Sequence, residues 1–257
     1  MNLYDILERY LYSNIPSALF IDIDGVMTVA RGSYVMDLEV VGFLRELESK
    51  GVPVYLVSGN AYPVVLTLQR YLGLSSIFIA ENGCVIQMHE EVLKICKESL
   101  DSLADVISKS FSLKPSPSNA YRLCDRAFHV PKEIRSDVHA VRELEKKIMH
   151  LYPDIHALYT GYVIHIYPKY CSKSSGIRIV AEKLGMDLKK AVAIGDSVTD
   201  IDMIKAVGIG VATGDADEEL KKEAVIVLPF RASESTKFFL KNLLSYIEIK
   251  FRVSSSI

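Results

Sequence analysis

Short, continuous apolar runs recur along the chain, and segments with helical periodicity separate them. The first three runs are "SALFIDI" (17–23), "VPVYLVSG" (52–59) and "SIFIAENG" (76–83). A run of this kind is typical of a strand buried on both faces, as in a parallel sheet. Helical patterns over 37–50 and 61–73 lie between the runs. Strand and helix in strict alternation predict a doubly wound parallel sheet.

The pattern changes after Gly83. Residues 84–95 predict a hairpin, and helical and antiparallel-strand patterns follow it as far as residue 168. From Lys173 the parallel pattern returns, with a helix over 173–184 and a strand over 190–196. We therefore expect an α/β protein in which an α+β domain interrupts a Rossmann-like core. The predicted domains are 1–83 and 169–257 for the discontinuous core and 84–168 for the insertion.

Composition excludes several classes of partner. The net charge of −2 over 257 residues gives no basic field for nucleic acid. The sequence has no signal-peptide pattern and no apolar stretch long enough to span a bilayer. Four widely spaced cysteines without a CxxC pair favour reduced thiols in a cytoplasm. We expect a cytoplasmic protein without nucleic-acid or membrane partners, and an exposed sheet edge leaves a homodimer open.

Polar residues gather where the predicted strands end. In open parallel sheets, ligands bind beyond the carboxyl ends of the strands. Taken singly, a segment such as "SGN" or "GDS" is typical of an ordinary turn. Four such polar segments, each at a strand end or a helix start, together indicate a functional site. The candidate residues, in chain order, are Asp22, Asp24, Ser58, Gly59, Asn60, Lys173, Asp196 and Asp200.

These residue types suit one kind of chemistry. Several carboxylates without a neighbouring imidazole or thiolate favour Mg²⁺, a hard cation that prefers oxygen ligands. A lysine and a serine beside them would supply donors for phosphoryl oxygens. The combination indicates phosphoryl transfer through a carboxylate nucleophile, with a small phosphorylated metabolite as substrate.

The chain resembles the haloacid dehalogenase-like (HAD) phosphatases in four motifs. These are "DIDGVMT", "VYLVSGN", Lys173 within "YCSKSSGI", and "GDSVTDIDM". The insertion after "ENG" stands where large-cap members of that superfamily carry a cap. More narrowly, "SGNAYPVVLTLQRYLG", "AENG" and "TGYVIHI" look like archaeal-type phosphoglycolate phosphatases. The resemblance extends through most of residues 17–245.

The resemblance implies a role for each candidate. Asp22 would be the nucleophile and Asp24 the acid–base. Mg²⁺ would be held by Asp22, the main-chain carbonyl of Asp24, Asp196 and Asp200. Phosphoryl oxygens would be bound by Ser58 and Lys173, with the N–H groups of Gly59 and Asn60 beside them.

The inserted domain would then read the leaving group of the substrate. Candidates to bind a substrate carboxylate are Arg122 and Arg126, together with Tyr162 and His165. The alternative interpretation is that these four are ordinary strand residues, which face solvent or the core of the inserted domain.

Two departures and three alternatives remain. Thr199 and Asp215 occupy positions where relatives often have Asn. A sugar-phosphate phosphatase of the same superfamily, of the sucrose-phosphate or phosphomannose type, would share the catalytic residues. A non-catalytic phospho-ligand binding protein is disfavoured because Asp22 and Asp24 are both intact. A serine esterase built on "IGDS" fails, because no histidine follows Ser197.

Overall fold

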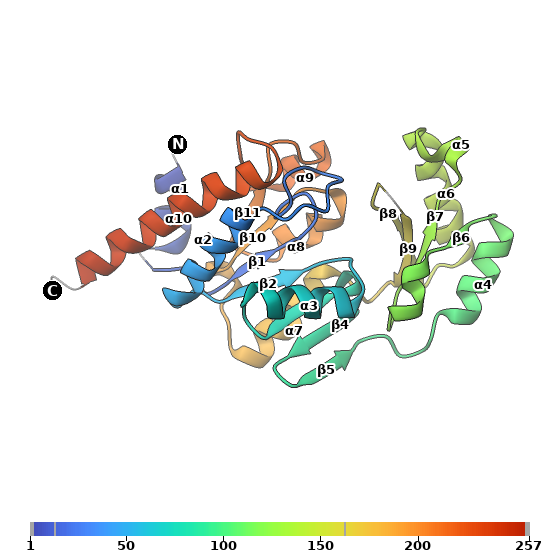
Figure 1. The fold of residues 1–257 in the computed structure, drawn as a ribbon, viewed down its shortest axis with the longest axis horizontal. Coiled ribbons are helices and arrows are strands. Elements are labelled where there is room, and N and C mark those ends of the chain that lie inside the picture. The colour runs from blue at the N-terminus through green and yellow to red at the C-terminus, as the bar shows by residue number, and fades with distance from the viewer. Residues whose placement is uncertain (1–2, 13, 162, 255–257) are drawn as a thin grey trace.

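The computed structural model describes residues 3–12, 14–161 and 163–254, and these form two sheets (Figure 1). The larger sheet has eight strands, and neighbouring strands pair in parallel except at the last two pairings in its spatial order. That order is β12 (Ile226–Val227), β11 (Ile209–Ala212), β10 (Val192–Gly195), β1 (Leu19–Ile21), β2 (Val54–Val57), β3 (Ile77–Ala80), β4 (Val85–Met88) and β5 (Glu91–Lys94). The predicted doubly wound parallel sheet is confirmed.

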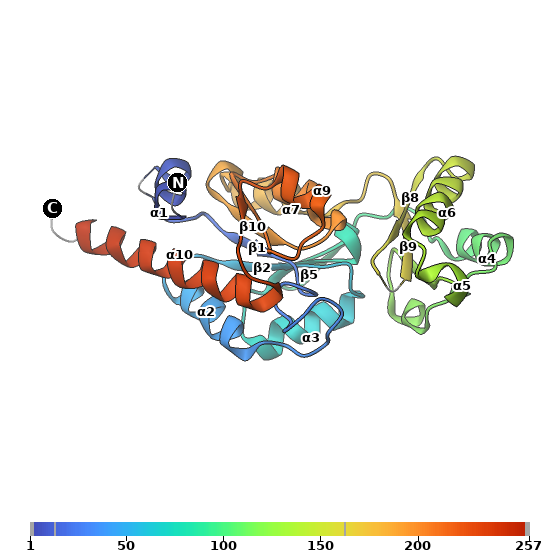
Figure 2. The same ribbon diagram turned by 90° about the horizontal axis from the view of Figure 1, so that it is seen from above.

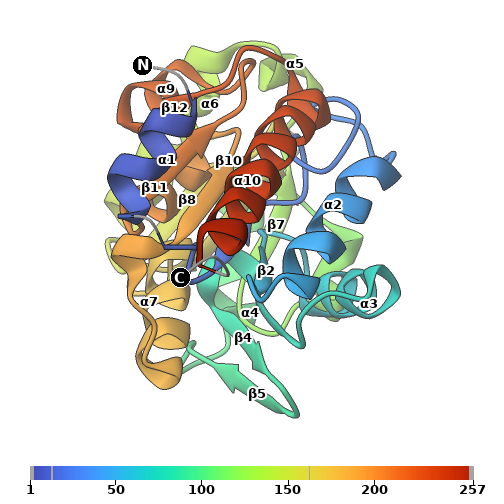
Figure 3. The same ribbon diagram turned by 90° about the vertical axis from the view of Figure 1, so that its left-hand side faces the viewer.

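Helices cover both faces of this sheet (Figure 2). Alternation along β1 separates the faces, because Leu19 and Ile21 pack into one apolar cluster and Phe20 into the other. The first cluster takes in α2 (Leu38–Ser49), α3 (Tyr62–Leu72) and α10 (Ala232–Ser254), with α1 (Leu3–Leu11) beside α10 (Figure 3). The second takes in α7 (Lys173–Leu184), α8 (Ile201–Lys205) and α9 (Glu218–Glu223). Among the described helices, α10 included, none is both long enough and apolar enough to cross a membrane.

Helix boundaries follow from capping residues that the sequence provides. Ser172 caps α7 by accepting a hydrogen bond from the Ser175 N–H, and the Ser175 side chain accepts one from the Ser172 N–H in return. This capping box starts the helix at Lys173, which fixes the position of that side chain. At the other end of a helix, Gly73 adopts the left-handed conformation with φ 65° and terminates α3.

The smaller sheet belongs to the insertion and faces the core (Figures 1 and 2). Its antiparallel strands, in spatial order, are β6 (Lys114–Pro115), β7 (Arg126–His129), β9 (Val163–Pro168) and β8 (Ile155–Tyr159). The helices on its outer side are α4 (Asp101–Ser110), α5 (Lys132–Arg135) and α6 (Val138–Leu151). Short 3₁₀ helices in the two domains are η1 (Glu81–Gly83), η2 (Pro117–Tyr121), η3 (Leu188–Lys190) and η4 (Val198–Asp200). The insertion has an apolar cluster of its own, around Phe128 and Ile164. We refer to it as the cap.

The predicted hairpin at 84–95 forms, but it continues the large sheet instead of opening the cap. β4 pairs antiparallel with β3, and β5 pairs with β4 (Figure 3). Two short apolar stretches on either side of the polar residues 89–91 identify a hairpin without specifying which sheet it joins, and the predicted boundary at residue 84 assigned this hairpin to the insertion. We propose that the cap begins after β5 and ends before α7.

The expectation of four reduced thiols is also wrong in part. Cys96 and Cys124 form a disulfide, whereas Cys84 and Cys171 are free and buried. Cys96 follows the core hairpin and Cys124 lies in the cap loop before β7, so the bond ties the two domains together. Residues 28 positions apart meet only because the cap folds back onto the core.

Candidate active site

Three carboxylates converge at the carboxyl end of two neighbouring core strands. Asp22 follows β1, Asp196 follows β10, and Asp200 lies in η4 just beyond. All three are buried, and each offers an oxygen within 4.8 Å of the others. The parallel pairing of β1 with β10 therefore brings together residues that lie more than 170 positions apart in the chain.

Lys173 joins this cluster from the first position of α7. Its Nζ donates to Oδ1 of Asp22 at 2.8 Å and to Oδ1 of Asp200 at 2.5 Å. Burial opposes its charge, but Asp200 and Asp22 together raise the pKa of Lys173 above its ordinary value. The lysine therefore stays protonated and offsets part of the negative charge of the cluster.

The second oxygen of Asp200 is occupied by backbone donors. Its Oδ2 accepts from the N–H groups of Asp196 and Ser197, both at 3.1 Å. Asp200 thus fixes the loop that carries Asp196 while its other oxygen holds Lys173. The sequence predicts it as a metal ligand, and its contacts also make it an orienting residue.

The electrostatics of the cluster favour a bound cation. Burial raises the pKa of Asp22 to about 7, with further contributions from Asp200 and Asp24, although Lys173 opposes them. Burial likewise raises the pKa of Asp196, and Asp200 and Asp22 add to the effect. Carboxylates crowded in this way ionise readily only when positive charge is placed among them. Because the donors are all oxygens, Asp22, Asp196 and Asp200 fit a hard divalent cation such as Mg²⁺.

Asp24 and the loop after β2 form the opposite side of the site. Asp24 is exposed, and its Oδ2 accepts from Nδ2 of Asn60 at 2.7 Å. Although its side chain reaches the surface, the protein around it removes enough water to raise the pKa of Asp24, and Asn60 opposes this shift. The Asn60 N–H donates to Oγ of buried Ser58 at 3.0 Å. The structure thus brings the predicted Ser58–Asn60 segment to the side chain of Asp24.

Arg31, which the sequence analysis did not single out, contacts the cluster directly. Its Nε lies 2.7 Å from Oδ2 of Asp196, and its Nη1 lies 2.9 Å from Oδ1 of Asp217. Gly25, with φ 75°, leaves room for this pair, since a Cβ there would meet both Asp196 and Arg31. No motif pointed to Arg31, because a single arginine in a loop is an ordinary surface residue.

Glu81 is a second residue that sequence reasoning missed. It follows β3, is completely buried, and accepts from the successive N–H groups of Leu123, Cys124 and Asp125 at 2.7–3.1 Å. These donors belong to the cap loop before β7, so one core carboxylate fixes the cap loop by its backbone. The local sequence Glu-Asn-Gly at a strand end does not predict such a contact.

The cap residue Arg122 reaches the core but is already paired. Its Nη1 lies 2.5 Å from Oδ1 of Asp125 and donates to the carbonyl of Gly59 at 3.0 Å. Asp125 also contacts Nδ1 of His165 at 2.8 Å and accepts from Asn82 at 3.2 Å. Arg122 therefore lies beside the predicted phosphate-binding loop, with its charge balanced by a buried carboxylate.

Of the remaining candidates, those that the structure describes are engaged in other contacts. Arg126 pairs with Asp101 and bonds backbone carbonyls inside the cap. Tyr162 lies outside the described residues. The hydroxyl of Thr199 contacts that of Ser197 at 2.7 Å, and Asp215 accepts from the Ala232 N–H at 2.8 Å. The side chain of Asp215 thus supports a neighbouring loop, while its main-chain carbonyl accepts from Arg31.

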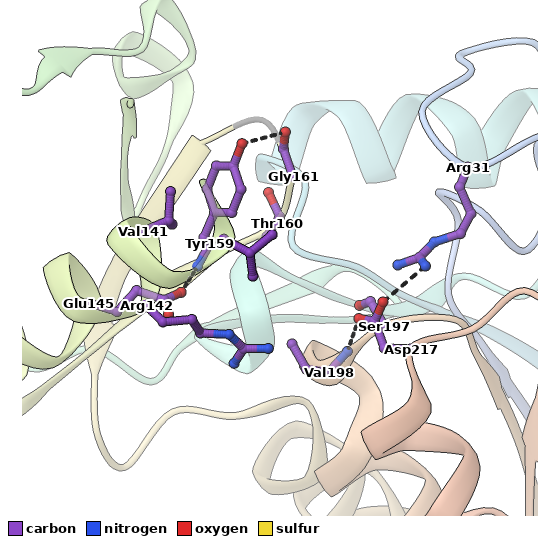
Figure 4. A pocket seen from close by; sticks show the side chains of 11 residues that line it. Arg31, Val141, Arg142, Glu145, Tyr159, Thr160, Gly161, Ser197, Val198 and Asp217 are labelled. Carbon is purple, nitrogen blue, oxygen red and sulfur yellow. Dashed lines mark hydrogen bonds and ion pairs between the residues drawn. The ribbon is translucent and has the colours of Figure 1, made fainter. Parts of the chain in front are cut away.

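A cleft of about 190 Å³ opens between the domains next to Asp196 (Figure 4). The core side carries Arg31, Ser197 and Asp217, and the cap side carries Arg142 of α6 and the turn between β8 and β9. Figure 4 shows the two arginines projecting toward the cleft from opposite sides. Because Arg31 in this lining is bonded to Asp196, the cleft lies beside the carboxylate cluster.

Comparison with known proteins identifies the family. The model of the haloacid dehalogenase-like hydrolases matches residues 19–122 and 109–236, two overlapping segments that span most of the chain. The chain belongs to this family. The resemblance noted from its four motifs is therefore confirmed, and as a member of this family the chain is a hydrolase.

Named relatives and solved structures agree with this assignment. A phosphoglycolate phosphatase of Sulfolobus acidocaldarius is 34% identical over 87% of this chain and 95% of its own length. One of Staphylothermus marinus is 39% identical over 80% and 88%. A Thermoplasma acidophilum crystal structure has a TM-score of 0.78 at 22% identity and covers 90% of this chain and 99% of its own. A HAD subclass IIB sugar phosphatase has a TM-score of 0.72 at 18% identity and covers 90% and 98%. Both structures share the fold.

Proposed function

We propose that this chain is a Mg²⁺-dependent phosphomonoester hydrolase that acts on 2-phosphoglycolate. One observation carries the reaction type: Asp22 is held by Lys173 inside an oxygen-only cluster, while Asp24 lies two residues on and bonds Asn60. The first carboxylate is buried and held in place, and the second is exposed. This division suits a nucleophile and an acid–base that share one site.

The reaction is expected to take two steps. An oxygen of Asp22 attacks phosphorus and forms an aspartyl-phosphate as the bond to the leaving oxygen breaks. Asp24 donates its proton to that oxygen, then takes a proton from the water that hydrolyses the intermediate to inorganic phosphate. The raised pKa of Asp24 suits the protonated form that the first step needs.

The other residues of the site hold the transferring group. Lys173 and Ser58, with the N–H groups of Gly59 and Asn60, would bind phosphoryl oxygens. Asp22, Asp196 and Asp200, together with the Asp24 carbonyl, would hold Mg²⁺. When bound, the cation would neutralise charge between the nucleophile and the phosphoryl oxygens.

The substrate is proposed from the relatives. Those of Sulfolobus and Staphylothermus are named phosphoglycolate phosphatase and cover most of this chain. The sugar-phosphate alternative keeps support from the sugar phosphatase that shares the fold. A cytoplasmic location and a homodimer stay predictions. The binding-only alternative has no support beyond the scaffold, because every carboxylate of the cluster is present.

Replacement of Asp22 tests the reaction. We expect Asp22→Asn to lower Mg²⁺-dependent hydrolysis of phosphoglycolate by more than about 10³-fold, because the amide is no nucleophile. Asp105→Asn, on the exposed face of α4, should keep wild-type activity. Substantial activity in Asp22→Asn would refute the nucleophile. A several-fold preference of the wild type for hexose phosphates in kcat/KM would instead favour the sugar-phosphate alternative.

A further inference from the structure

We propose that Arg31 binds the anionic group on the leaving group of the substrate, and that it becomes available when a cation takes over Asp196. The inference rests on the proposed function and adds the residue that selects among phosphate esters. It also differs from the sequence-based expectation, in which the candidates for this role all lie in the cap, Arg122 among them.

The position of Arg31 is the first argument. Its guanidinium bonds Asp196 through Nε and Asp217 through Nη1, and Nη1 also donates to the Asp215 carbonyl at 3.0 Å. About a third of the side chain is exposed, with 36% accessible, and it lines the cleft (Figure 4). The residue is therefore anchored at the rim of the cluster and open to a ligand in the cleft.

The second argument is competition for Asp196. Lys173 pairs with Asp22 and Asp200, and Arg31 pairs with Asp196, so side-chain cations occupy all three carboxylates. A divalent cation held by the same carboxylates would repel the guanidinium and weaken its bond to Asp196. Asp217 still holds Nη1, so Arg31 would stay at the rim and turn toward the cleft.

The third argument is the pair of arginines on opposite sides of the cleft, whose lining also holds the carboxylates of Glu145 and Asp217. Arg142 of the cap projects into it opposite Arg31, and its own partner Glu219 is 3.7 Å away on the exposed surface. Arg122 is less suited, because it is almost fully buried and already bonded to Asp125 and Gly59. A planar guanidinium beside the cluster matches a carboxylate on a short leaving group.

The test compares esters that differ in one charge. We would measure kcat/KM for phosphoglycolate and for ethyl phosphate, which lacks the carboxylate, in wild type, Arg31→Gln and Arg31→Lys. We expect the ratio of the two values to fall by at least about tenfold in Arg31→Gln and by less in Arg31→Lys. Arg178→Gln, on the exposed face of α7, is the matched control and should keep the wild-type ratio.

A second readout is independent of catalysis. Binding of Mn²⁺ followed by electron paramagnetic resonance should be several-fold tighter in Arg31→Gln, because the competing cation is gone. An unchanged ester ratio, or unchanged or weaker Mn²⁺ binding, would overturn the role of Arg31 while leaving the proposed hydrolase intact. A wild type that hydrolyses neither ester would overturn the proposed function, and the substrate role of Arg31 with it.

Discussion

Asp125 carries its charge in a fully buried position, where it joins the cap to the core. Burial disfavours the carboxylate, but Arg122 and His165 hold the pKa of Asp125 below its ordinary value. A depressed pKa contributes stability above the unfolded pKa of about 4 and loses it as pH falls through the folded pKa. We expect Asp125→Asn to lower the free energy of unfolding by about 3–5 kcal/mol near pH 7, since Arg122 would stay buried without its counter-ion.

The pH dependence separates this effect from simple loss of packing. Urea unfolding of wild type and Asp125→Asn should differ most above about pH 5 and converge as pH falls below about 4. Asp105→Asn, exposed in the same domain, should match wild type throughout. A difference that stays constant across this range would show that the charge of Asp125 is not what stabilises the cap loop.

Residues differ in how far the sequence predicts them. Asp22, Ser58 and Asp196 were predictable because the carboxyl ends of parallel strands lie at the same edge of the sheet, and this holds for any loop conformation. Glu81 was not, because its partners lie 42–44 residues away in a cap loop. Where such a loop docks depends on the packing of two domains, which local patterning does not encode.

The elements that join core and cap carry the disulfide of Cys96 and Cys124. Closing a loop with a sequence separation of 28 restricts the unfolded chain, by about 3–4 kcal/mol in the chain-entropy account. We expect the double variant Cys96→Ser, Cys124→Ser to lose about that much free energy of unfolding, measured with urea under non-reducing conditions. Dithiothreitol should lower the free energy of unfolding of the wild type to that of the double variant, and it should leave the free energy of unfolding of the variant unchanged.

Peptide mapping can contradict the prediction that Cys96 and Cys124 form a disulfide. If the protein purified without reductant carries free thiols at both Cys96 and Cys124, the disulfide does not form in solution.

The β4–β5 hairpin shows why secondary-structure elements were easier to predict from the sequence than the strands with which they pair. Its two short apolar stretches around a polar turn could be seen in the sequence, whereas its pairing with β3 depends on a free edge of the large sheet.

On the scale of the whole molecule, the carboxylate cluster joins the two halves of a core that the cap interrupts. Asp22 comes from the segment before the cap, and Lys173, Asp196 and Asp200 come from the segment after it. Repulsion among these carboxylates acts between the segments, so a cation bound there stabilises the assembled core. The expectation of two core halves came from the alternation of helices and strands, which returns with the helix that begins at Lys173.

Metal binding should therefore raise the melting temperature of the whole chain. A ligand at 100 times its Kd stabilises the folded state by about 2.7 kcal/mol, which for a chain of this size is a Tm increase of about 5–10 °C. We expect Mg²⁺ to produce this shift relative to EDTA in wild type and in Asp105→Asn, measured by calorimetry. Asp196→Asn, compared with its own metal-free Tm, should lose most of the shift because one of the three carboxylates is gone. Equal shifts in Asp196→Asn and wild type would place the cation elsewhere.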